Sequence, residues 1–420
     1  MRRALRFLLG FCALAVVAAC SPTADFGFPA NTGLPMPSSG APVTAAPLPP
    51  ARGDIVGSGP VRVAVLLPLT GSASTVGGSM AAASRMAMEI AGGNIQLVIK
   101  DTGGTASGAR AAAQAAVSEK ASLILGPLLA DSVAAAGAVA KSADIPLIGF
   151  SNTSAVAEPG VYLLNVMPEV EVMRSIGFAR AQGAQAIAAL IPDNAYGQLQ
   201  RAAFEAATRE LNLTVRGVEM FADEASGRRA IEALVPLLKA GQIDTLFLPD
   251  RATAPSFGIL LEAAGVRRDR IVIIGSADWE GDNAILNQPY LSGAIYPAVD
   301  PNGLAMLARE YQTRFGGAPH PFATLAYTAV LLAGNDALVL TQPRYANGVL
   351  TRLSGFTGRD GPFRFLPDGR AEYGLVIKQI LQGRAQVLDP VRLGGVPAQT
   401  ARPSGGGNVI PPVGASLVSN

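Results

Sequence analysis

Short runs of buried-type residues alternate with helical segments along most of this chain, and this alternation constrains the fold more than any other feature. Val61–Leu67 is an apolar, β-branched run ended by Pro68, which is typical of a strand buried on both faces. Residues 80–91 then carry apolar side chains at helical spacing. The same alternation restarts near Pro168. Two successive series of strand–helix–strand units predict an α/β fold with two doubly wound, mostly parallel sheets.

The predicted elements define where a ligand should bind. The predicted strands are 61–67, 95–99, 123–125, 145–150, 186–191, 213–219, 243–248 and 271–275. The predicted helices are 80–91, 108–120, 131–142, 169–182, 196–211, 226–240 and one that ends at Gly265. In such sheets the ligand lies beyond the carboxyl ends of the strands. We therefore expect the loops after Leu67, Leu125, Phe150, Ile191 and Ile274 to meet at a cleft.

Composition sets the size of the molecule and argues against several functions. The chain has 420 residues, 49% hydrophobic and 15% charged, which is enough apolar material for two lobes. A net charge of +2 without a basic run beyond the first residues argues against nucleic acid as a partner. His320 is the only histidine, and no phosphate-binding loop, nucleophile elbow or metal-ligand motif occurs. The sequence predicts a protein that is not an enzyme and has no cofactor and no metal site.

The N-terminal residues predict export and attachment to a membrane. Three arginines precede the apolar residues 7–17, a stretch too short to span a bilayer comfortably. Small residues then lead to Cys20. This pattern resembles the cleavage site of bacterial lipoproteins, which implies that residues 1–19 are a signal peptide and that Cys20 carries lipid. Several acyl chains hold a protein stably at a membrane.

The segments that flank the body predict disorder. Residues 20–60, which begin with the lipidated cysteine, are rich in Pro, Ala, Gly, Ser and Thr and are expected to form a tether. Residues 396–420 are expected to form an equally unstructured tail. Ser21 after the cysteine resembles lipoproteins of the outer membrane, so we expect a periplasmic location with the outer membrane favoured.

A series of short motifs, in a fixed order over residues 61–388, resembles the type 1 periplasmic binding proteins and in particular their leucine/isoleucine/valine-binding branch. The motifs are VAVLLPLTG at 63–71, KDT at 100–102, LILGP at 123–127, IPLIGFS at 145–151, DNAYG at 193–197 and GRDGPFRF at 358–365, with Asp368-Gly369. The resemblance implies a two-lobed fold with a three-strand hinge, crossed near Val166, Val299 and Gly361. Lobe 1 is then 61–166 plus 299–360, and lobe 2 is 167–298 plus 361–388.

The resemblance also implies a ligand site. In amino-acid-binding members the ligand carboxylate is held by the loops after the third and fourth strands, which here are 128–132 and 151–154. Backbone N–H groups at helix starts suit an anion. The candidate ligand-binding residues are Leu129, Ala130, Ser151, Asn152, Thr153, Tyr196 and Asp278. Tyr196 would close the cleft from the second lobe, and Asp278 lies near the acid that would meet an ammonium group.

Departures from the family pattern leave two functions open. Leu128-Leu129-Ala130 replaces a small, hydroxyl-bearing stretch, and Thr75-Val76 lacks an expected aromatic side chain. Gly126-Pro127-Leu128-Leu129 also resembles the penicillin-binding-protein activators, lipoproteins that regulate peptidoglycan synthesis by contact with a synthase. We expect such an activator, although the helical-repeat domain that some activators carry is missing. The alternative is an amino-acid or small-anion receptor of an ABC importer, with a permease as its partner.

Overall fold

Two parallel-stranded α/β lobes form the body of the protein. The computed structural model describes residues 48–393. The predicted signal peptide, Cys20 and the predicted tail 396–420 lie outside the described residues. Within the described part, no helix has the length and apolar character needed to cross a membrane. Two sheets of mostly parallel strands, each covered by helices on both faces, confirm the predicted fold class.

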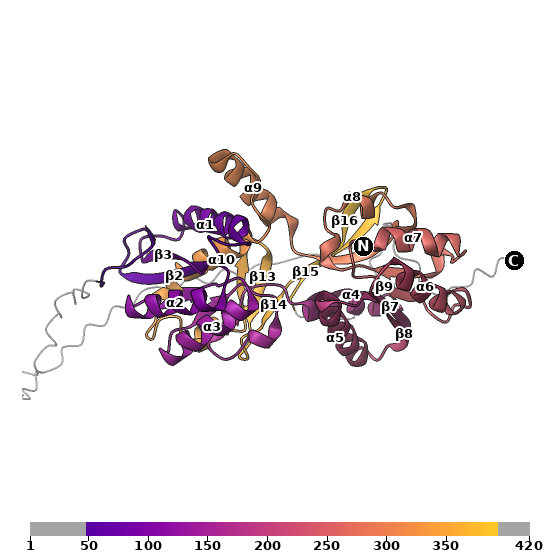
Figure 1. Cartoon of the computed structure of the whole chain (residues 1–420), viewed down its shortest axis with the longest axis horizontal. Coiled ribbons are helices and arrows are strands. Elements are labelled where there is room, and N and C mark those ends of the chain that lie inside the picture. Colours follow the sequence, from indigo (N-terminus) through magenta and orange to yellow (C-terminus); the bar gives the residue numbers. More distant parts are fainter. Residues whose placement is uncertain (1–47, 394–420) are drawn as a thin grey trace, which may run out of the picture. The chain divides into compact units, whose positions relative to one another are not determined.

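The first sheet has six strands in the order β1-β3-β2-β4-β5-β6. Figure 1 labels β2 and β3 of this sheet. These are β1 (Asp54–Val56), β2 (Val61–Leu67), β3 (Ile95–Asp101), β4 (Leu123–Leu125), β5 (Leu147–Gly149) and β6 (Val161–Leu163). All pairs except β1–β3 are parallel. Alternate residues of β2 face opposite cores. Helices α1 (Ser74–Met88) and α10 (Ala323–Ala333) cover one face, and α2 (Ala106–Ser118) and α3 (Ala130–Ser142) the other.

The second sheet has seven strands in the order β16-β15-β11-β10-β9-β7-β8. These are β7 (Ala186–Pro192), β8 (Thr214–Phe221), β9 (Thr245–Phe247), β10 (Val272–Ile274), β11 (Ile295–Ala298), β15 (Leu375–Leu381) and β16 (Arg384–Arg392). The last two are antiparallel additions to a parallel sheet. One core contains residues of α4 (Pro168–Ala181) and α5 (Ala195–Glu210), and the other contains residues of α6 (Glu224–Lys239) and α7 (Ala254–Ala263). The short α8 (Asn283–Leu286) precedes β11.

The remaining elements lie between β11 and β15. They are α9 (Pro301–Phe315), α11 (Asp336–Val339), α12 (Asn347–Leu350), β12 (Phe356–Gly358), β13 (Gly361–Phe365) and β14 (Ala371–Tyr373). Strands β12–β14 form a small antiparallel sheet. Phe363, Phe365 and Tyr373 belong to the same buried cluster as β2 and α10. The chain therefore leaves the first lobe at about Gly374 rather than near Gly361, because three aromatic side chains hold 361–373 in the first core.

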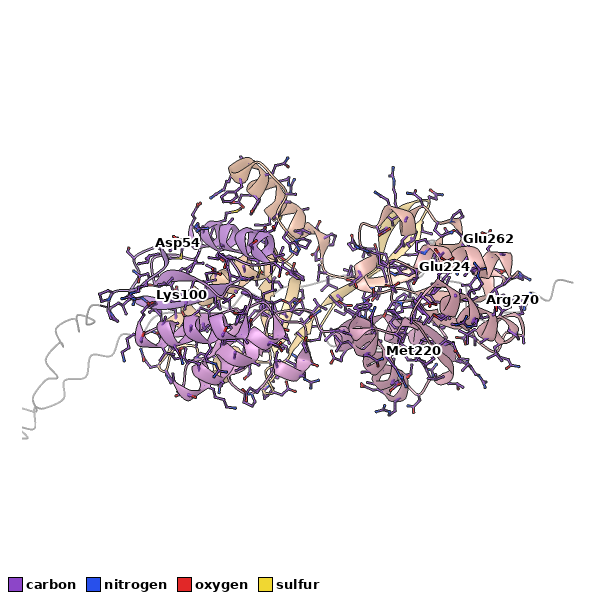
Figure 2. The ribbon with its side chains drawn as sticks, in the orientation of Figure 1. Asp54, Lys100, Met220, Glu224, Glu262 and Arg270 are labelled. Atoms are coloured by element: carbon purple, nitrogen blue, oxygen red, sulfur yellow. The ribbon has the colours of Figure 1, made fainter. Side chains whose placement is uncertain are left out.

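Strand β1 falls inside the stretch for which composition predicted a disordered tether. It pairs antiparallel with β3, with Asp54 opposite Ile99. Buried cations hold the chain just before it: Lys100 Nζ donates to the carbonyl of Arg52 at 2.6 Å, and Arg62 donates to that of Pro49 at 2.8 Å. Figure 2 labels Lys100 and Asp54 of β1. A polar segment is ordered here because its backbone groups satisfy buried donors.

Helix α1 begins at Ser74, well before residue 80, where the apolar pattern predicted its start. Gly77 explains the difference. A Cβ atom there would lie 2.1 Å from the carbonyl oxygen of Pro68, so only glycine lets the first turn approach the end of β2. The helix thus starts directly over the loop that follows β2, and the glycine pair that reads as a loop is part of the helix.

A buried ion pair fastens α4 to the C-terminal hairpin. Arg174 is only 2% exposed, and its guanidinium pairs with Asp389 of β16. Its Nε also donates to the carbonyl of Leu375 at 2.9 Å. Burial lowers the pKa of Arg174, and the hydrogen bond and charge of Asp389 oppose that shift. Because a buried charge without its partner is strongly unfavourable, this contact fixes where α4 lies on the second sheet.

We predict that Asp389→Asn destabilises the protein by about 3 kcal/mol, because Arg174 stays buried without its counter-charge. Urea unfolding followed by circular dichroism measures the change. The matched control is Asp269→Asn, which breaks the exposed pair with Arg267 and should leave the unfolding midpoint unchanged. Equal midpoints for both variants would contradict a structural role for the buried pair.

Candidate functional site

Tyr196 is positioned by the first turn of α5, directly after β7. The side chain of Asn194 caps this helix by accepting from the N–H of Gly197 at 2.9 Å. A Cβ atom on residue 197 would lie 1.7 Å from the carbonyl oxygen of Pro192. The cap and the glycine explain the Asn194-Ala195-Tyr196-Gly197 motif: together they bring the turn that bears the tyrosine against the end of its strand.

The phenol of Tyr196 joins loops that follow two other strands. Its hydroxyl donates to Ser276 Oγ at 3.0 Å, and Ser276 Oγ donates in turn to the carbonyl of Pro249 at 2.6 Å. Pro249 follows β9 and Ser276 follows β10. Asp278 follows β10 two residues after Ser276. Burial, followed by the charge of Asp278, raises the pKa of Tyr196, so the phenol stays neutral.

Glu171, in the first turn of α4, completes this cluster. Its carboxyl group is partly buried, and its pKa responds to the charge of Asp278 and to the backbone N–H of Ala277. Burial, then the charge of Asp278, raises the pKa of Glu171 to about 8, although the N–H of Ala277 opposes the shift. The hydrogen-bonded phenol and hydroxyl, together with two nearby acids, therefore belong to the carboxyl edge of the second sheet. We refer to Glu171, Tyr196, Ser276 and Asp278 as the acid cluster.

The turn that carries Asp278 is rigidly supported from below. Trp279 is fully buried, and its ring centroid lies 6.3 Å from that of Tyr296 on β11. The hydroxyl of Tyr296 donates to Glu280 at 3.0 Å, and Lys378 of β15 pairs with the same carboxylate at 2.7 Å. Glu280 therefore has a counter-charge, whereas Asp278 is exposed toward solvent.

In the first lobe, the loop after β4 leads into an uncapped helix. Leu129 occupies the N-cap position of α3 and gives no side-chain hydrogen bond, so the N–H groups of the first turn have no cap. Ser132 is 1% exposed and its Oγ has no hydrogen-bond partner within the described residues. Asp131 in the same turn is exposed. Free N–H groups at a 13-residue helix with an unsatisfied buried hydroxyl suit an anionic group.

The loop after β5 lies beside this helix start. The N–H of Phe150 donates to the carbonyl of Pro127 at 2.8 Å, which ties the two loops together. Ser151 is buried, and its Oγ accepts from the N–H of Thr153 at 3.1 Å. Asn152 is exposed, and Thr153 is partly exposed. The structure therefore places the five predicted residues of the first lobe on two adjacent loops.

Asp101 shapes the loop after β2. It accepts hydrogen bonds from Thr70 Oγ1 and from the N–H groups of Leu69, Thr70 and Gly103. Burial alone would raise the pKa of Asp101, but these hydrogen bonds outweigh it and lower the pKa. Asp101 is thus a structural loop acid.

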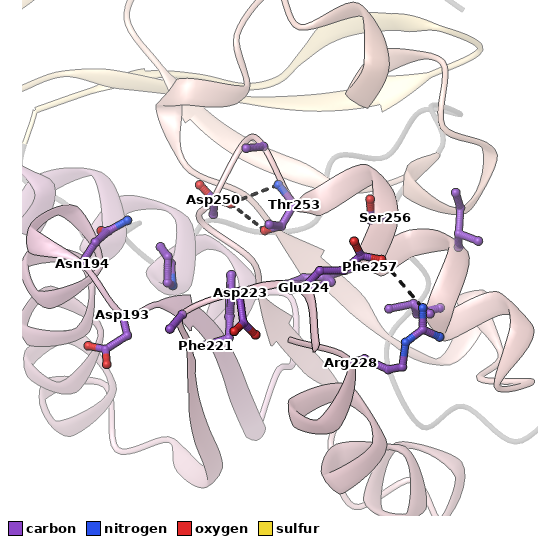
Figure 3. A pocket seen from close by; sticks show the side chains of 15 residues that line it. Asp193, Asn194, Phe221, Asp223, Glu224, Arg228, Asp250, Thr253, Ser256 and Phe257 are labelled. Atoms are coloured by element: carbon purple, nitrogen blue, oxygen red, sulfur yellow. Dashed lines mark hydrogen bonds and ion pairs between the residues drawn. The ribbon is translucent and has the colours of Figure 1, made fainter. Parts of the chain in front are cut away.

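A groove of about 580 Å³ lies beyond β7, β8 and β9 (Figure 3). Two of its acids hold backbone turns: Asp223 caps α6 by accepting from the N–H of Ser226 at 2.7 Å, and Asp250 accepts from the N–H and hydroxyl of Thr253 just before α7. Asp250 directly follows Pro249, so the groove adjoins the acid cluster. The apolar floor includes Phe221 and Phe257, whose rings pack edge to face at 5.0 Å.

The structure places Tyr196 and Asp278, both predicted as binding residues, in the second lobe, after β7 and after β10. Sequence reasoning missed Glu171 and Ser276. Glu171 is one of two acids in the first turn of α4, where carboxylates are common because they interact favourably with the helix dipole. Nothing in the local sequence distinguishes it as a site residue. Ser276 immediately follows Gly275, at a strand end that the sequence did mark. Within residues 48–393, no group of three or more His, Cys, Asp or Glu side chains is arranged to hold a metal ion.

Comparison with known proteins agrees with this architecture. A family model described as "Periplasmic binding protein" matches residues 60–384. A putative branched-chain amino acid ABC transporter structure from Rhodospirillum rubrum aligns with a TM-score of 0.68 at 20% identity, covering 78% of this chain and 99% of that one. No curated protein sequence matches the chain.

Two further structures share the fold with bound ligands. A substrate-binding protein from Desulfitobacterium hafniense in complex with Leu aligns with a TM-score of 0.57 at 20% identity, over 78% of this chain and 99% of that one. A solute-binding protein from R. palustris in complex with benzoate aligns with a TM-score of 0.53 at 17% identity, over 79% and 97%. The fold is that of the type 1 periplasmic binding proteins. The chain belongs to the periplasmic binding protein family.

Proposed function

We propose that this protein is the solute receptor of an ABC importer and binds an amino acid or a closely similar small molecule. The observation that carries the proposal is the acid cluster of the second lobe, where the ligand's ammonium group would lie between Asp278 and Tyr196. A receptor needs polar groups that face solvent in the free protein and become buried when the ligand binds. Asp278 meets this requirement, since it is exposed and close to a neutral phenol.

The first lobe supplies the complementary half of the proposed site. The uncapped start of α3, with Ala130 in its first turn, would receive the ligand carboxylate, assisted by Thr153 and Asn152 of the neighbouring loop. Leu129 is 40% exposed at the same place. It would contact an apolar side chain of the ligand. This contact would explain why Leu128-Leu129-Ala130 stands where the family pattern has hydroxyl residues.

A second candidate function is activation of a peptidoglycan synthase, and exposed Leu129 is the observation that favours it. A bulky apolar side chain at the mouth of a ligand loop suits a protein contact as well as a ligand. For either function we propose that Cys20 is lipidated and holds the protein at a membrane in the periplasm, with the outer membrane expected for an activator.

We predict that L-leucine at saturating concentration raises the melting temperature of the purified protein, because a ligand that binds only the folded state stabilises it. Asp278→Asn should weaken binding at least tenfold, which corresponds to about 1.4 kcal/mol. The control Asp193→Asn changes an exposed acid at the same sheet edge, outside the acid cluster, and should bind normally. No thermal shift with leucine or any other amino acid would count against the receptor proposal.

The activator proposal predicts association with a purified bifunctional glycosyltransferase–transpeptidase, measured by surface plasmon resonance. Leu129→Ser should reduce this association because it removes the exposed apolar contact. The control is Leu353→Ser, since Leu353 is 85% exposed elsewhere on the first lobe. Absence of association with such a synthase would remove the activator proposal.

The anchor proposal predicts that Cys20→Ser moves the protein from the membrane to the soluble fraction of cell extracts, because the acyl chains have no attachment site. Cys12→Ser is the control and should remain with membranes. A Cys20→Ser protein that still sediments with membranes would refute lipid anchoring at this residue.

A further inference from the structure

The groove of about 580 Å³ beyond β7, β8 and β9 has two unlike walls. Asp223 and Glu224 line it from the start of α6. Ile259 and Leu260 line it from α7, on the same helix face as Ser256, because residues three and four apart on a helix are neighbours. Figure 3 labels residues of both walls. The groove therefore has a charged wall on α6 and a largely apolar wall on α7.

The groove lies apart from the acid cluster, although Asp250 adjoins that cluster. Helices α6 and α7 pack against one face of the second sheet, whereas α4 and α5, which carry Glu171 and Tyr196, pack against the other face. The groove extends to the end of β8, the edge strand that is far from β11 and β15 in strand order. None of the four residues of the acid cluster lines it. An occupant of the groove would therefore not compete with a ligand held at the acid cluster.

Carboxylates outnumber cations around the groove. Arg228 supplies the only guanidinium among the lining residues, against four carboxylates, which are those of Asp193, Asp223, Glu224 and Asp250. Glu224 and Arg228 are 3.9 Å apart and mostly exposed, so their mutual attraction is weak. Asp193, Asp223 and Asp250 accept hydrogen bonds, but none of them forms a salt bridge in the part of the chain that the structure describes. The groove therefore favours a positively charged occupant.

The helix starts at the groove do not call for an anion instead. Hydrogen bonds from Ser226, together with the charge of Arg229, lower the pKa of Asp223, so this carboxylate stays ionised at the start of α6. Before α7, Asp250 accepts from the N–H of Thr253 at 3.0 Å. Both turns thus already have a negative acceptor for their N–H groups. The acids still outnumber the cations when Arg229 is counted with the groove.

We propose that this groove docks a short basic segment of a partner protein, held as an extended chain in which Lys or Arg alternates with apolar residues. An extended chain points successive side chains to opposite sides, so its cations face α6 while its apolar side chains face α7. Ile259 is 57% exposed in the free protein and would be covered by such a segment. The volume is in the range of about 300–1,000 Å³ that is typical of ligand pockets, which limits the enclosed part to a few residues.

This docking does not depend on the proposed ligand, and it holds whether the partner is a permease or a synthase. It states which chemistry the partner must present to the second lobe. Electrostatic complementarity of this kind chiefly increases the rate of association and selects the partner, and salt weakens it. The apolar wall adds the contact that a purely electrostatic encounter lacks.

Fluorescence anisotropy of labelled pentapeptides with the purified protein tests the proposal. The main probe is KLKLK with an amidated C-terminus, which in extended form presents its lysines to one side and its leucines to the other. It should bind at low salt and weaken at least about fivefold in about 0.5 M NaCl. KKKLL, of the same composition without the alternation, and ELELE, of opposite charge, should bind about tenfold more weakly or not at all. Absence of KLKLK binding, or equal binding of KKKLL, would overturn the proposal.

Variants of each wall assign the peptide to the groove. Asp223→Asn combined with Glu224→Gln should weaken KLKLK about tenfold, while the new amide at the first position still caps α6. Ile259→Ser should weaken KLKLK but leave KSKSK, which lacks the leucines, unchanged. The matched controls are Glu232→Gln, an exposed acid of α6 outside the groove, and Leu199→Ser, a 40% exposed leucine of α5. Wall variants that bind KLKLK as tightly as their controls do would refute docking in this groove.

Two competitors separate this site from other modes of binding. Spermine carries several positive charges without a peptide chain, and displacement of KLKLK by spermine as efficiently as by unlabelled KLKLK would overturn docking of a protein segment. L-Leucine should not displace the probe, and displacement would place the peptide in the proposed ligand site instead. If KLKLK binding depends on both walls while no amino acid shifts the melting temperature, the docking proposal stands and the receptor proposal fails.

Discussion

Parallel pairing of strands is the constraint on which the candidate site depends. In the second sheet, β9 pairs in parallel with both β7 and β10, in registers that bring Ile187 opposite Thr245 and Ile274 opposite Phe247. The carboxyl ends of the three strands are therefore adjacent, although they are far apart along the chain. Tyr196, Pro249 and Ser276 each follow one of these ends, and a single chain of hydrogen bonds connects them. The parallel direction of the strands, rather than any single side chain, therefore brings these three positions together.

Helix α4 links the stability of the fold to the chemistry of the site. Arg174 is one turn beyond Glu171 on the same helix and is held by Asp389 and by the carbonyl of Leu375. Arg174 can reach both partners only when α4 is packed in this position on the second sheet. The same position partly buries Glu171, and burial, followed by the charge of Asp278, raises its pKa. The ion pair of Arg174 and the partly buried carboxyl group of Glu171 are thus placed by the same helix.

The sequence predicted the alternation of strands and helices well, because runs such as Val61–Leu67 are buried on both faces and read as strands without ambiguity. The resemblance to the periplasmic binding proteins pointed to Tyr196 and Asp278, and their role in binding stays a prediction. The sequence did not predict β1, whose order depends on Lys100 and Arg62 binding its preceding carbonyls. Nor did it predict the late crossing at Gly374, which depends on aromatic contacts of Phe363 and Phe365. Such contacts join residues distant in the chain, and no local pattern reports them.

The two lobes differ in how far their polar groups are already satisfied. Around the first lobe's loops, Asp101 accepts four hydrogen bonds and Ser151 accepts one from Thr153, so few polar side chains there await a partner. In the second lobe, Asp278 is exposed at the end of β10 and forms no salt bridge among residues 48–393. A ligand gains most from the groups whose partners are missing, because satisfied groups must first give up an existing bond. If the protein is the receptor proposed above, the exposed carboxylate of Asp278 and the uncapped start of α3 are therefore the groups that a ligand would satisfy most directly.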